Sequence, residues 1–167
     1  MSSQSDPKVD TLTHLDADGN PHMVDVGGKT DTHRVAVAEA WVHMSSSTRA
    51  LAVSGGHKKG DVLQIARLAG IQGAKRTADL IPLCHPLPLD AVSVEITPEG
   101  DDALRIVATA RTFWRTGVEM EAMTAAAAAA LTVYDMLKGT ERGICLSRIR
   151  LLEKRGGRSG HWVASEA

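Results

Sequence analysis

The first strong pattern in the chain is an alternation with a period of two over residues 34–44. Apolar residues occupy both sides of this alternation: one side carries Val35, Val37 and Trp41, and the other carries Ala36, Ala38 and Val42. Such a pattern is typical of a strand that is buried on both faces. We therefore predict a strand here with both of its faces covered.

Two helices are predicted after this strand. Ser45 and the three hydroxyl residues that follow it can cap a short helix that reaches Val53, where two glycines end it. Residues 61–78 then show apolar positions at helical spacing, with Asp61 placed as the N-terminal cap.

A longer helix is predicted from Gly117 to Lys138. It contains an unbroken alanine run over residues 125–130, flanked by larger apolar residues at helical spacing. Gly139 follows the last turn, as is common at helix ends. Because alanine side chains are small, we expect another helix or sheet to approach this helix closely, which fits an oligomer.

The remaining segments predict strands. Alternating residues at 92–96 and 104–108, separated by a turn at 98–102, predict an antiparallel hairpin. Residues 147–153 alternate again as a final strand, and residues 155–160 form a basic glycine loop.

The element order is therefore β-α-β-β-α-β, which indicates an α+β, ferredoxin-like fold with an antiparallel sheet. Right-handed crossovers put both helices on one face of that sheet. Because several strands are apolar on both sides, the other face needs a cover, and we expect an oligomer. We predict one domain over residues 13–163, preceded by a disordered tail over residues 1–12.

Composition excludes several classes of protein. The chain has 167 residues and a formal net charge of -1, which argues against a general nucleic-acid or membrane binder. It has one Phe, one Tyr and three Trp, too few to stack on a single-stranded nucleic acid. Its two cysteines fit a reduced protein, and neither a membrane span nor a signal peptide is evident. We expect a cytoplasmic protein.

The long helix carries charge at both ends. Glu119 and Glu121 lie in its first turn, and Asp135 and Lys138 share a face in its last turns. Apolar neighbours predict that much of this charge is buried and functional, although Asp135 and Lys138 could equally form a surface ion pair. Glu121 and Asp135 are about 21 Å apart along the helix axis, since each residue rises about 1.5 Å. Either they act on opposite ends of a long ligand, or a neighbouring subunit completes each site.

Three loops are further candidates for binding. Lys58 and Lys59 precede a helix N-terminus and could bind phosphate, or could be a solvated turn. Residues 83–85, Leu-Cys-His, lie in a proline-fixed loop that could aim an imidazole at a ligand, or could simply be packed. The glycine loop at 155–160 could wrap a polyphosphate, or could be a flexible basic tail. No metal site is predicted, because adjacent Cys and His are poorly spaced as chelating ligands.

Taken together, these segments resemble the cyclic pyranopterin monophosphate synthase family of molybdenum-cofactor biosynthesis. Seven matching motifs span about residues 14–162: His22-Met-Val-Asp-Val with Lys29, Lys59-Gly-Asp, Ala69-Gly-Ile with Ala74-Lys-Arg-Thr, Asp79-Leu-Ile-Pro-Leu-Cys-His-Pro-Leu, Thr116-Gly-Val-Glu-Met-Glu-Ala-Met-Thr-Ala, Ala130-Leu-Thr-Val-Tyr-Asp-Met-Leu-Lys and Leu151-Leu-Glu-Lys-Arg-Gly-Gly-Arg-Ser-Gly. Short motifs are weak singly, but seven in the same order are specific.

The resemblance implies a ferredoxin-like fold and a homohexamer built as a trimer of dimers, with each active site at a dimer interface. It implies conversion of 3′,8-cyclo-7,8-dihydro-GTP to cyclic pyranopterin monophosphate with release of pyrophosphate, without a cofactor. Asp135, Lys59 and Lys138 would be the catalytic residues. The substrate-binding residues would be Leu83, Cys84, His85, Glu119, Met120, Glu121, Arg34 and Lys154. The last pair, Arg34 and Lys154, would assist the triphosphate.

A lysine that serves as the base needs a pKa well below its reference value of about 10.4. Burial and a second cation lower that pKa, whereas Asp135 raises it. Two other classes of function remain open: a ferredoxin-like module that binds a metabolite without catalysis, and an oligomeric scaffold in which Asp135 and Lys138 form an inter-subunit ion pair.

Overall fold

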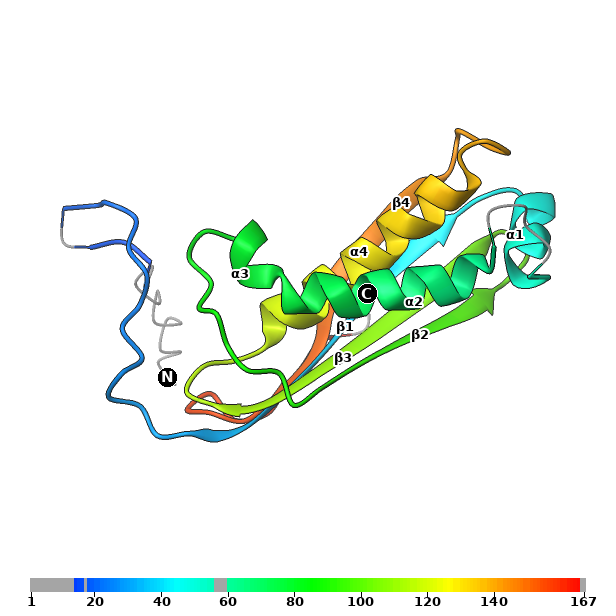
Figure 1. The fold of residues 1–167 in the computed structure, drawn as a ribbon. Coiled ribbons are helices and arrows are strands. Elements are labelled where there is room, and N and C mark those ends of the chain that lie inside the picture. Colours follow the sequence, from blue (N-terminus) through cyan, green and yellow to red (C-terminus); the bar gives the residue numbers. More distant parts are fainter. Residues whose placement is uncertain (1–13, 17, 56–59, 166–167) are drawn as a thin grey trace, which may run out of the picture.

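The computed structural model describes residues 14–16, 18–55 and 60–165 and contains one antiparallel sheet with helices packed against it (Figure 1). Its elements are β1 (Thr32–His43), α1 (Ser46–Val53), α2 (Val62–Lys75), α3 (Thr77–Leu80), β2 (Ala91–Glu99), β3 (Ala103–Trp114), α4 (Glu119–Leu137), β4 (Cys145–Arg155) and β5 (Trp162–Val163). The strand order is β2-β3-β1-β4-β5, with every adjacent pair antiparallel. The chain is therefore an α+β protein. The predicted tail over residues 1–12 lies outside the described residues.

The predicted strands and helices are confirmed, with one correction. The helix expected over residues 61–78 ends at Lys75, and a separate short helix, α3, follows. The reason is local: Arg76 leaves helical geometry at φ -111° and ψ 11°, and its N–H bonds back to the Gly73 carbonyl at 3.0 Å. The two-residue strand β5 was not predicted.

Both predicted helix caps are present. The Asp61 carboxylate accepts hydrogen bonds from the N–H groups of Leu63 and Gln64 at 3.0 and 3.1 Å. The Ser45 hydroxyl accepts from the Thr48 N–H at 3.4 Å. These bonds satisfy backbone donors that the first helical turn cannot pair internally, so both helices begin where the sequence indicates.

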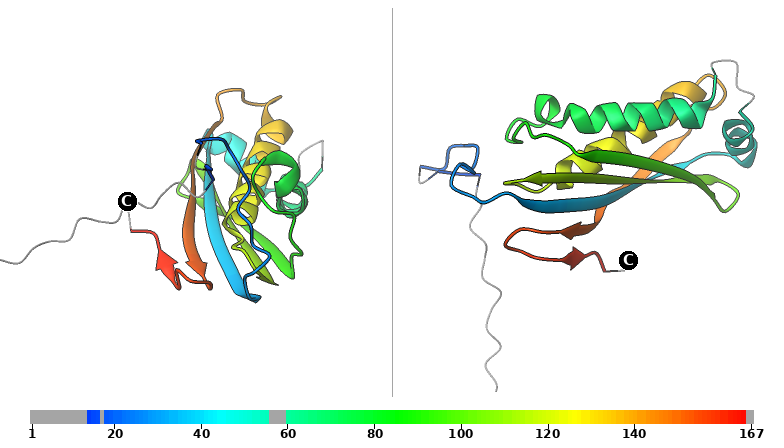
Figure 2. Two further views of the ribbon diagram at one scale, coloured as in Figure 1. Left: turned by 90° about the vertical axis from the view of Figure 1, so that its left-hand side faces the viewer. Right: turned by 60° about the horizontal axis from the view of Figure 1, so that its bottom comes forward.

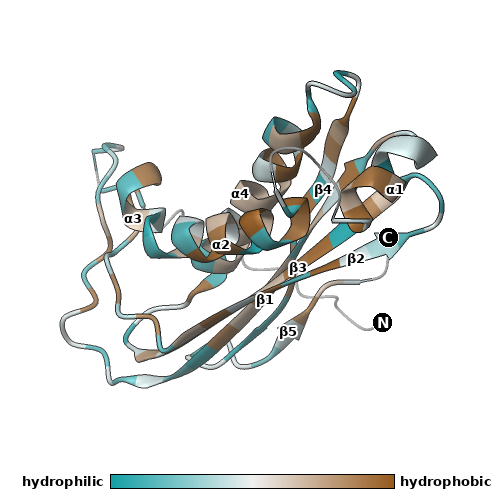
Figure 3. Ribbon diagram, turned by 45° about the vertical axis from the view of Figure 1, so that its right-hand side comes forward, coloured by the Kyte–Doolittle hydropathy of each residue, from teal (hydrophilic) through white to brown (hydrophobic). Residues whose placement is uncertain are grey.

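Helices α2 and α4 lie side by side on one face of the sheet (Figures 1 and 2). Apolar stretches of β1 and β3 lie beneath them (Figure 3). The part of α4 that faces the core carries small, fully buried residues: Ala122, Ala125, Ala126, Ala129 and Ala130. The close approach expected at the alanine run is confirmed, but α2 and the sheet of the same chain make it, so the run is not evidence for a second subunit.

Two glycines of α2 make this close packing possible. A Cβ atom on Gly70 would lie 2.9 Å from the Ala125 carbonyl oxygen, and one on Gly73 would lie 2.7 Å from the Ala128 Cβ. Real Cβ atoms do not approach other atoms so closely, so the two backbones can meet only where α2 lacks side chains.

The opposite face of the sheet is not covered by any helix of the described residues (Figure 2). No helix of the described residues supplies the second cover that the alternation in β1 predicts, and the expectation that another subunit supplies it stays a prediction. The alternating residues of β1 nevertheless include one buried carboxylate, Glu39, whose oxygens accept from Arg105 at 2.8 Å and Arg150 at 2.7 Å. Burial alone would raise the pKa of Glu39, but the hydrogen bonds from Arg150 and Arg105 outweigh it and hold the pKa below its ordinary value.

No helix among the described ranges combines the length and the apolar character needed to cross a membrane.

The contact between α2 and α4 predicts that position 73 does not tolerate a residue larger than glycine. Gly73→Val should lower the free energy of unfolding by about 2 kcal/mol or more, because the added atoms overpack a rigid backbone contact. Urea denaturation measures this change. The control is Gln72→Val, which adds the same side chain at the exposed neighbouring position and should change the free energy by less than about 1 kcal/mol. Equal losses in the two variants would contradict the packing argument.

Candidate active site

A cavity of about 500 Å³ lies where β3 ends and α4 begins. Five separate segments supply its walls, and the lining residues are His14, Val24, Val26, Lys29, Leu83, Cys84, His85, Leu87, Thr116, Gly117, Glu119, Met120, Glu121 and Arg158. Six of the eight predicted substrate-binding residues are among them: the triplet at 83–85 together with Glu119, Met120 and Glu121. The structure thus brings into one cavity two motifs that are more than thirty residues apart in the sequence.

Glu121 is the most deeply buried charged group of this cavity, with 4% of its surface exposed. Burial raises its pKa to about 7, and the negative charge of Glu119 acts in the same direction. The Cys84 thiol lies nearby, and its pKa is raised by burial and by the charge of Glu121. At neutral pH the Glu121 carboxyl group can therefore either donate or accept a hydrogen bond. This suits recognition of a polar heterocycle.

Glu119 is held between Gly117 and Lys154. A Cβ atom on Gly117 would lie 1.8 Å from a Glu119 carboxylate oxygen, so the absence of a side chain there lets the carboxylate fold back over the turn. The Lys154 amine lies 3.5 Å from the other oxygen of Glu119 and also donates a hydrogen bond to the Ser159 hydroxyl. The predicted residue Lys154 therefore contacts the wall of the cavity through Glu119.

A second cavity, of about 480 Å³, adjoins the first. Its lining residues are Gly28, Lys29, Thr30, Thr32, Arg34, Gly157 and Arg158, and Lys29 and Arg158 line both cavities. Arg34, the remaining predicted residue, thus lies in the second cavity. Within the described part of the chain, Thr32 Oγ1 and Arg34 Nε are buried without a hydrogen-bond partner. Three cations and two unused polar atoms make this a favourable place for an anion.

The glycine loop after β4 shapes the second cavity. Gly156 and Gly157 have φ angles of +96° and +74°, which residues with side chains rarely adopt. A Cβ atom on Gly157 would lie 1.8 Å from an Arg34 guanidinium nitrogen. The loop therefore lets the Arg34 side chain lie directly against its backbone.

Lys29 and Arg158 were not among the predicted site residues. Both belong to segments that carry the family resemblance, and Arg158 lies in the loop predicted as a polyphosphate nest. The signal that could have identified them in the sequence is that each is a basic residue directly after two glycines. Nothing in the sequence indicated that residues near positions 29 and 158 meet.

Asp135 and Lys138 lie at the C-terminal end of α4, and neither of them lines either cavity. Their side chains form an ion pair at 2.6 Å and are 64% and 51% exposed, so the expectation of burial is wrong for the single chain. The hydrogen bond from Lys138 to Asp135 raises the pKa of Lys138, which is opposite to the shift that a lysine base requires. Lys59, the third predicted catalytic residue, lies outside the described residues.

The described residues contain no group of three or more His, Cys, Asp or Glu side chains placed to hold a metal ion. The titratable groups of the cavities instead combine the buried Glu121 and the half-buried Glu119 with the exposed Lys29 and Arg158 and the half-buried Arg34. That combination is suited to binding a polar, anionic small molecule.

The chain belongs to the MoaC family, whose pattern it matches over residues 23–157. A curated relative from Rhodospirillum rubrum is named cyclic pyranopterin monophosphate synthase. It is 55% identical over 166 residues, which cover 99% of this chain and 100% of the relative. The family match includes nearly all of the residues that line the two cavities.

Glu121 predicts a stability that depends on pH. Its pKa is about 7 in the folded chain, against an ordinary value of 4.5, so between these values the folded state retains a proton that the unfolded state releases. The free energy of unfolding should therefore fall as the pH rises from 4.5 to 7, by up to about 3 kcal/mol. Glu121→Gln should lose this dependence and gain stability relative to wild type as the pH rises.

Urea denaturation at several pH values and one protein concentration measures the effect. Glu95→Gln, at an exposed position of β2, controls for the loss of a carboxylate and should keep the wild-type profile. Parallel profiles for wild type and Glu121→Gln would show that this carboxyl group does not titrate in the range.

Proposed function

We propose that this protein converts 3′,8-cyclo-7,8-dihydro-GTP to cyclic pyranopterin monophosphate and releases pyrophosphate, as a step of molybdenum-cofactor biosynthesis. The observation that carries the proposal is the pair of joined cavities in a chain 55% identical to a named synthase. The first cavity carries Glu119 and the buried Glu121, whereas the cations Lys29, Arg34 and Arg158 line the second. A nucleotide with a triphosphate has the matching division between a polar ring system and a concentrated negative charge.

In this proposal the ring system of the substrate lies in the first cavity. Leu83, Cys84, His85, Met120 and Glu121 surround it, and the rigid loop at 83–85 offers backbone groups as well as an imidazole. Glu121, with its pKa of about 7, can supply a donor or an acceptor to the ring edge. Binding energy from this cavity would hold the ring while its bonds rearrange.

The triphosphate would extend into the second cavity. Lys29, Arg34 and Arg158 line it, and Lys154 lies close to the first cavity beside Glu119. Guanidinium groups bind phosphate oxygens in a bidentate manner, and the amine of a lysine adds point charge. Pyrophosphate leaves with a concentrated negative charge, which these cations would stabilise.

Proton transfer would come from Asp135, Lys59 and Lys138. Opening of the purine, closure of the pterin ring and formation of the cyclic phosphate all require protons to move. Because Asp135 is about 21 Å from Glu121 along α4, one chain does not place it at the ring. We therefore propose that a second subunit brings its own Asp135 and Lys138 to the cavity.

The uncovered face of the sheet supports an oligomer. It carries Glu39 with its two arginine partners, and the ring of Trp41 lies beneath the guanidinium group of Arg148 at 5.6 Å. We propose a homohexamer built as a trimer of dimers, in which each subunit is a single ferredoxin-like domain over residues 13–163. We also propose that the protein is cytoplasmic and uses no cofactor.

Turnover tests the proposal directly. The folded protein is incubated with the cyclic dihydro-GTP, and pyrophosphate and a fluorescent pterin derivative of the product are measured. Asp135→Asn should lose most of the turnover with unchanged circular dichroism and hydrodynamic size. A wild-type protein that binds the substrate without releasing pyrophosphate would indicate a metabolite-binding module. Dissociation of Asp135→Asn would instead favour a scaffold.

A mixing experiment tests the shared site. Glu121→Ala and Asp135→Asn remove groups from opposite ends of α4, so each variant alone should be inactive. In a mixed dimer one site carries both changes and the other carries neither, so equal mixing after subunit exchange should restore about a quarter of wild-type turnover. A mixture that remains inactive after proven exchange would show that both groups act within one chain.

A further inference from the structure

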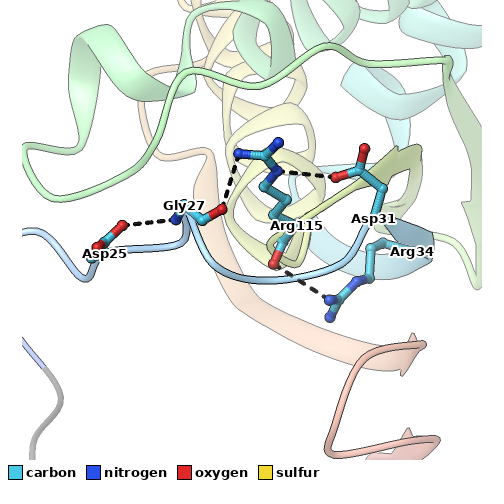
Figure 4. Close-up of polar contacts among 5 residues, drawn as sticks. All are labelled: Asp25, Gly27, Asp31, Arg34 and Arg115. Atoms are coloured by element: carbon cyan, nitrogen blue, oxygen red, sulfur yellow. Dashed lines mark hydrogen bonds and ion pairs between the residues drawn. The ribbon is translucent and has the colours of Figure 1, made fainter.

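Arg115 lies immediately beyond the last rung of the β1–β3 ladder, which pairs Thr32 with Trp114. The backbone pairing of β1 with β3 ends there, and the Arg115 side chain makes the next contacts with the chain that precedes β1. The guanidinium Nε lies 3.2 Å from the Asp31 carboxylate, and Nη1 donates to the Gly27 carbonyl at 3.4 Å (Figure 4). One side chain therefore holds the segment before β1 at two points, four residues apart.

The segment held in this way is a compact loop. The Asp25 carboxylate accepts a hydrogen bond from the Gly27 N–H at 2.7 Å, and the Lys29 N–H donates to the Val26 carbonyl at 3.1 Å. Lys29 lies between the two points that Arg115 contacts. The position of its backbone is therefore set by Arg115 on both sides.

Lys29 lines both cavities, so it lies at the junction through which a ligand would pass from one to the other. Arg34 is attached to the same residue, because its Nη2 donates to the Arg115 carbonyl at 3.4 Å (Figure 4). Arg115 thus contacts the loop that carries Lys29 through its side chain, and it contacts Arg34 through its backbone carbonyl.

The ion pair between Arg115 and Asp31 adds little to folding stability. The two side chains are 38% and 34% exposed, and pairs of this exposure are screened by solvent. The guanidinium group also stacks over the Trp114 ring at 5.4 Å, which fixes its direction. These contacts determine where the loop lies more than whether the chain folds.

We propose that Arg115 is a positioning residue that fixes Lys29 at the junction of the two cavities, where Lys29 binds the phosphate end of an anionic ligand. This inference rests on the proposed function, in which that ligand is the triphosphate of the substrate and later the released pyrophosphate. Arg115 itself need not touch the ligand.

The test is a double-mutant cycle with Arg115→Gln and Lys29→Gln, read out with inorganic pyrophosphate by isothermal titration calorimetry. Arg115→Gln alone should weaken pyrophosphate binding about tenfold, because the lysine is no longer held in place. In the Lys29→Gln background the same change should cost less than about twofold, because Arg115 acts through Lys29. Equal losses in both backgrounds would overturn the inference.

Kinetics add a second measurement. Arg115→Gln should raise the KM for the cyclic dihydro-GTP about tenfold and change kcat by less than about twofold, as expected for lost binding of a group that does not react. Arg115→Lys keeps the charge opposite Asp31 but not the forked geometry, so it should restore part of the binding. The matched control, Arg76→Gln, removes another arginine paired with an aspartate and should leave both constants unchanged.

The outcomes separate the two proposals. A wild-type protein that binds pyrophosphate but does not convert the cyclic dihydro-GTP overturns the proposed function, while the binding cycle still decides the role of Arg115. A fully active protein in which Arg115→Gln alters neither the KM nor pyrophosphate binding overturns only the inference. So does a wild-type protein that does not bind pyrophosphate at millimolar concentration.

Discussion

The close contact between α2 and α4 is the constraint on which the rest of the structure depends. Gly70 and Gly73 bring the α2 backbone against a run of alanines, and those alanines in turn lie flat on the sheet. With so little side-chain volume between them, α4 packs closely against both α2 and the sheet. Its first turn lies in the wall of the cavity and its last turn lies at the far end of the fold. Every argument about a site shared between subunits follows from this separation of Glu121 from Asp135.

The second organising feature is the separation of acidic from basic residues around the two cavities. Acids cluster where α4 begins, and Glu121 is buried deeply enough to alter its ionisation. Cations gather a short distance away, where the start of β1 meets the glycine loop after β4. Gly156 and Gly157 are essential to that meeting, because only their bare backbone leaves room for Arg34. The result is two adjacent cavities that share Lys29 and Arg158, one lined by Glu119 and Glu121 and the other by three cations.

The sequence predicted the local features of the fold well, because their causes are local. Asp61 and Ser45 cap helices through bonds to their near neighbours, and the alternation in β1 follows from its pleat. The sequence also placed Glu121 and the Leu-Cys-His loop at a site through the family resemblance, and the structure brings them together. It could not show that Arg115 contacts Gly27, because that contact depends on the β1–β3 register. Nor could it show that Lys138 is exposed, since burial depends on which surfaces other elements leave open.

The ionisation of Glu121 has a thermodynamic consequence for anything that enters the cavity. A carboxyl group that titrates near 7 is a mixture of two protonation states at neutral pH. A ligand that prefers one state must draw a proton from the solvent or return one to it as it binds. The heat of association would then vary with the ionisation enthalpy of the buffer, even for a ligand that carries no titratable group of its own. Ligand binding in the cavity would thus be coupled to the uptake or release of protons.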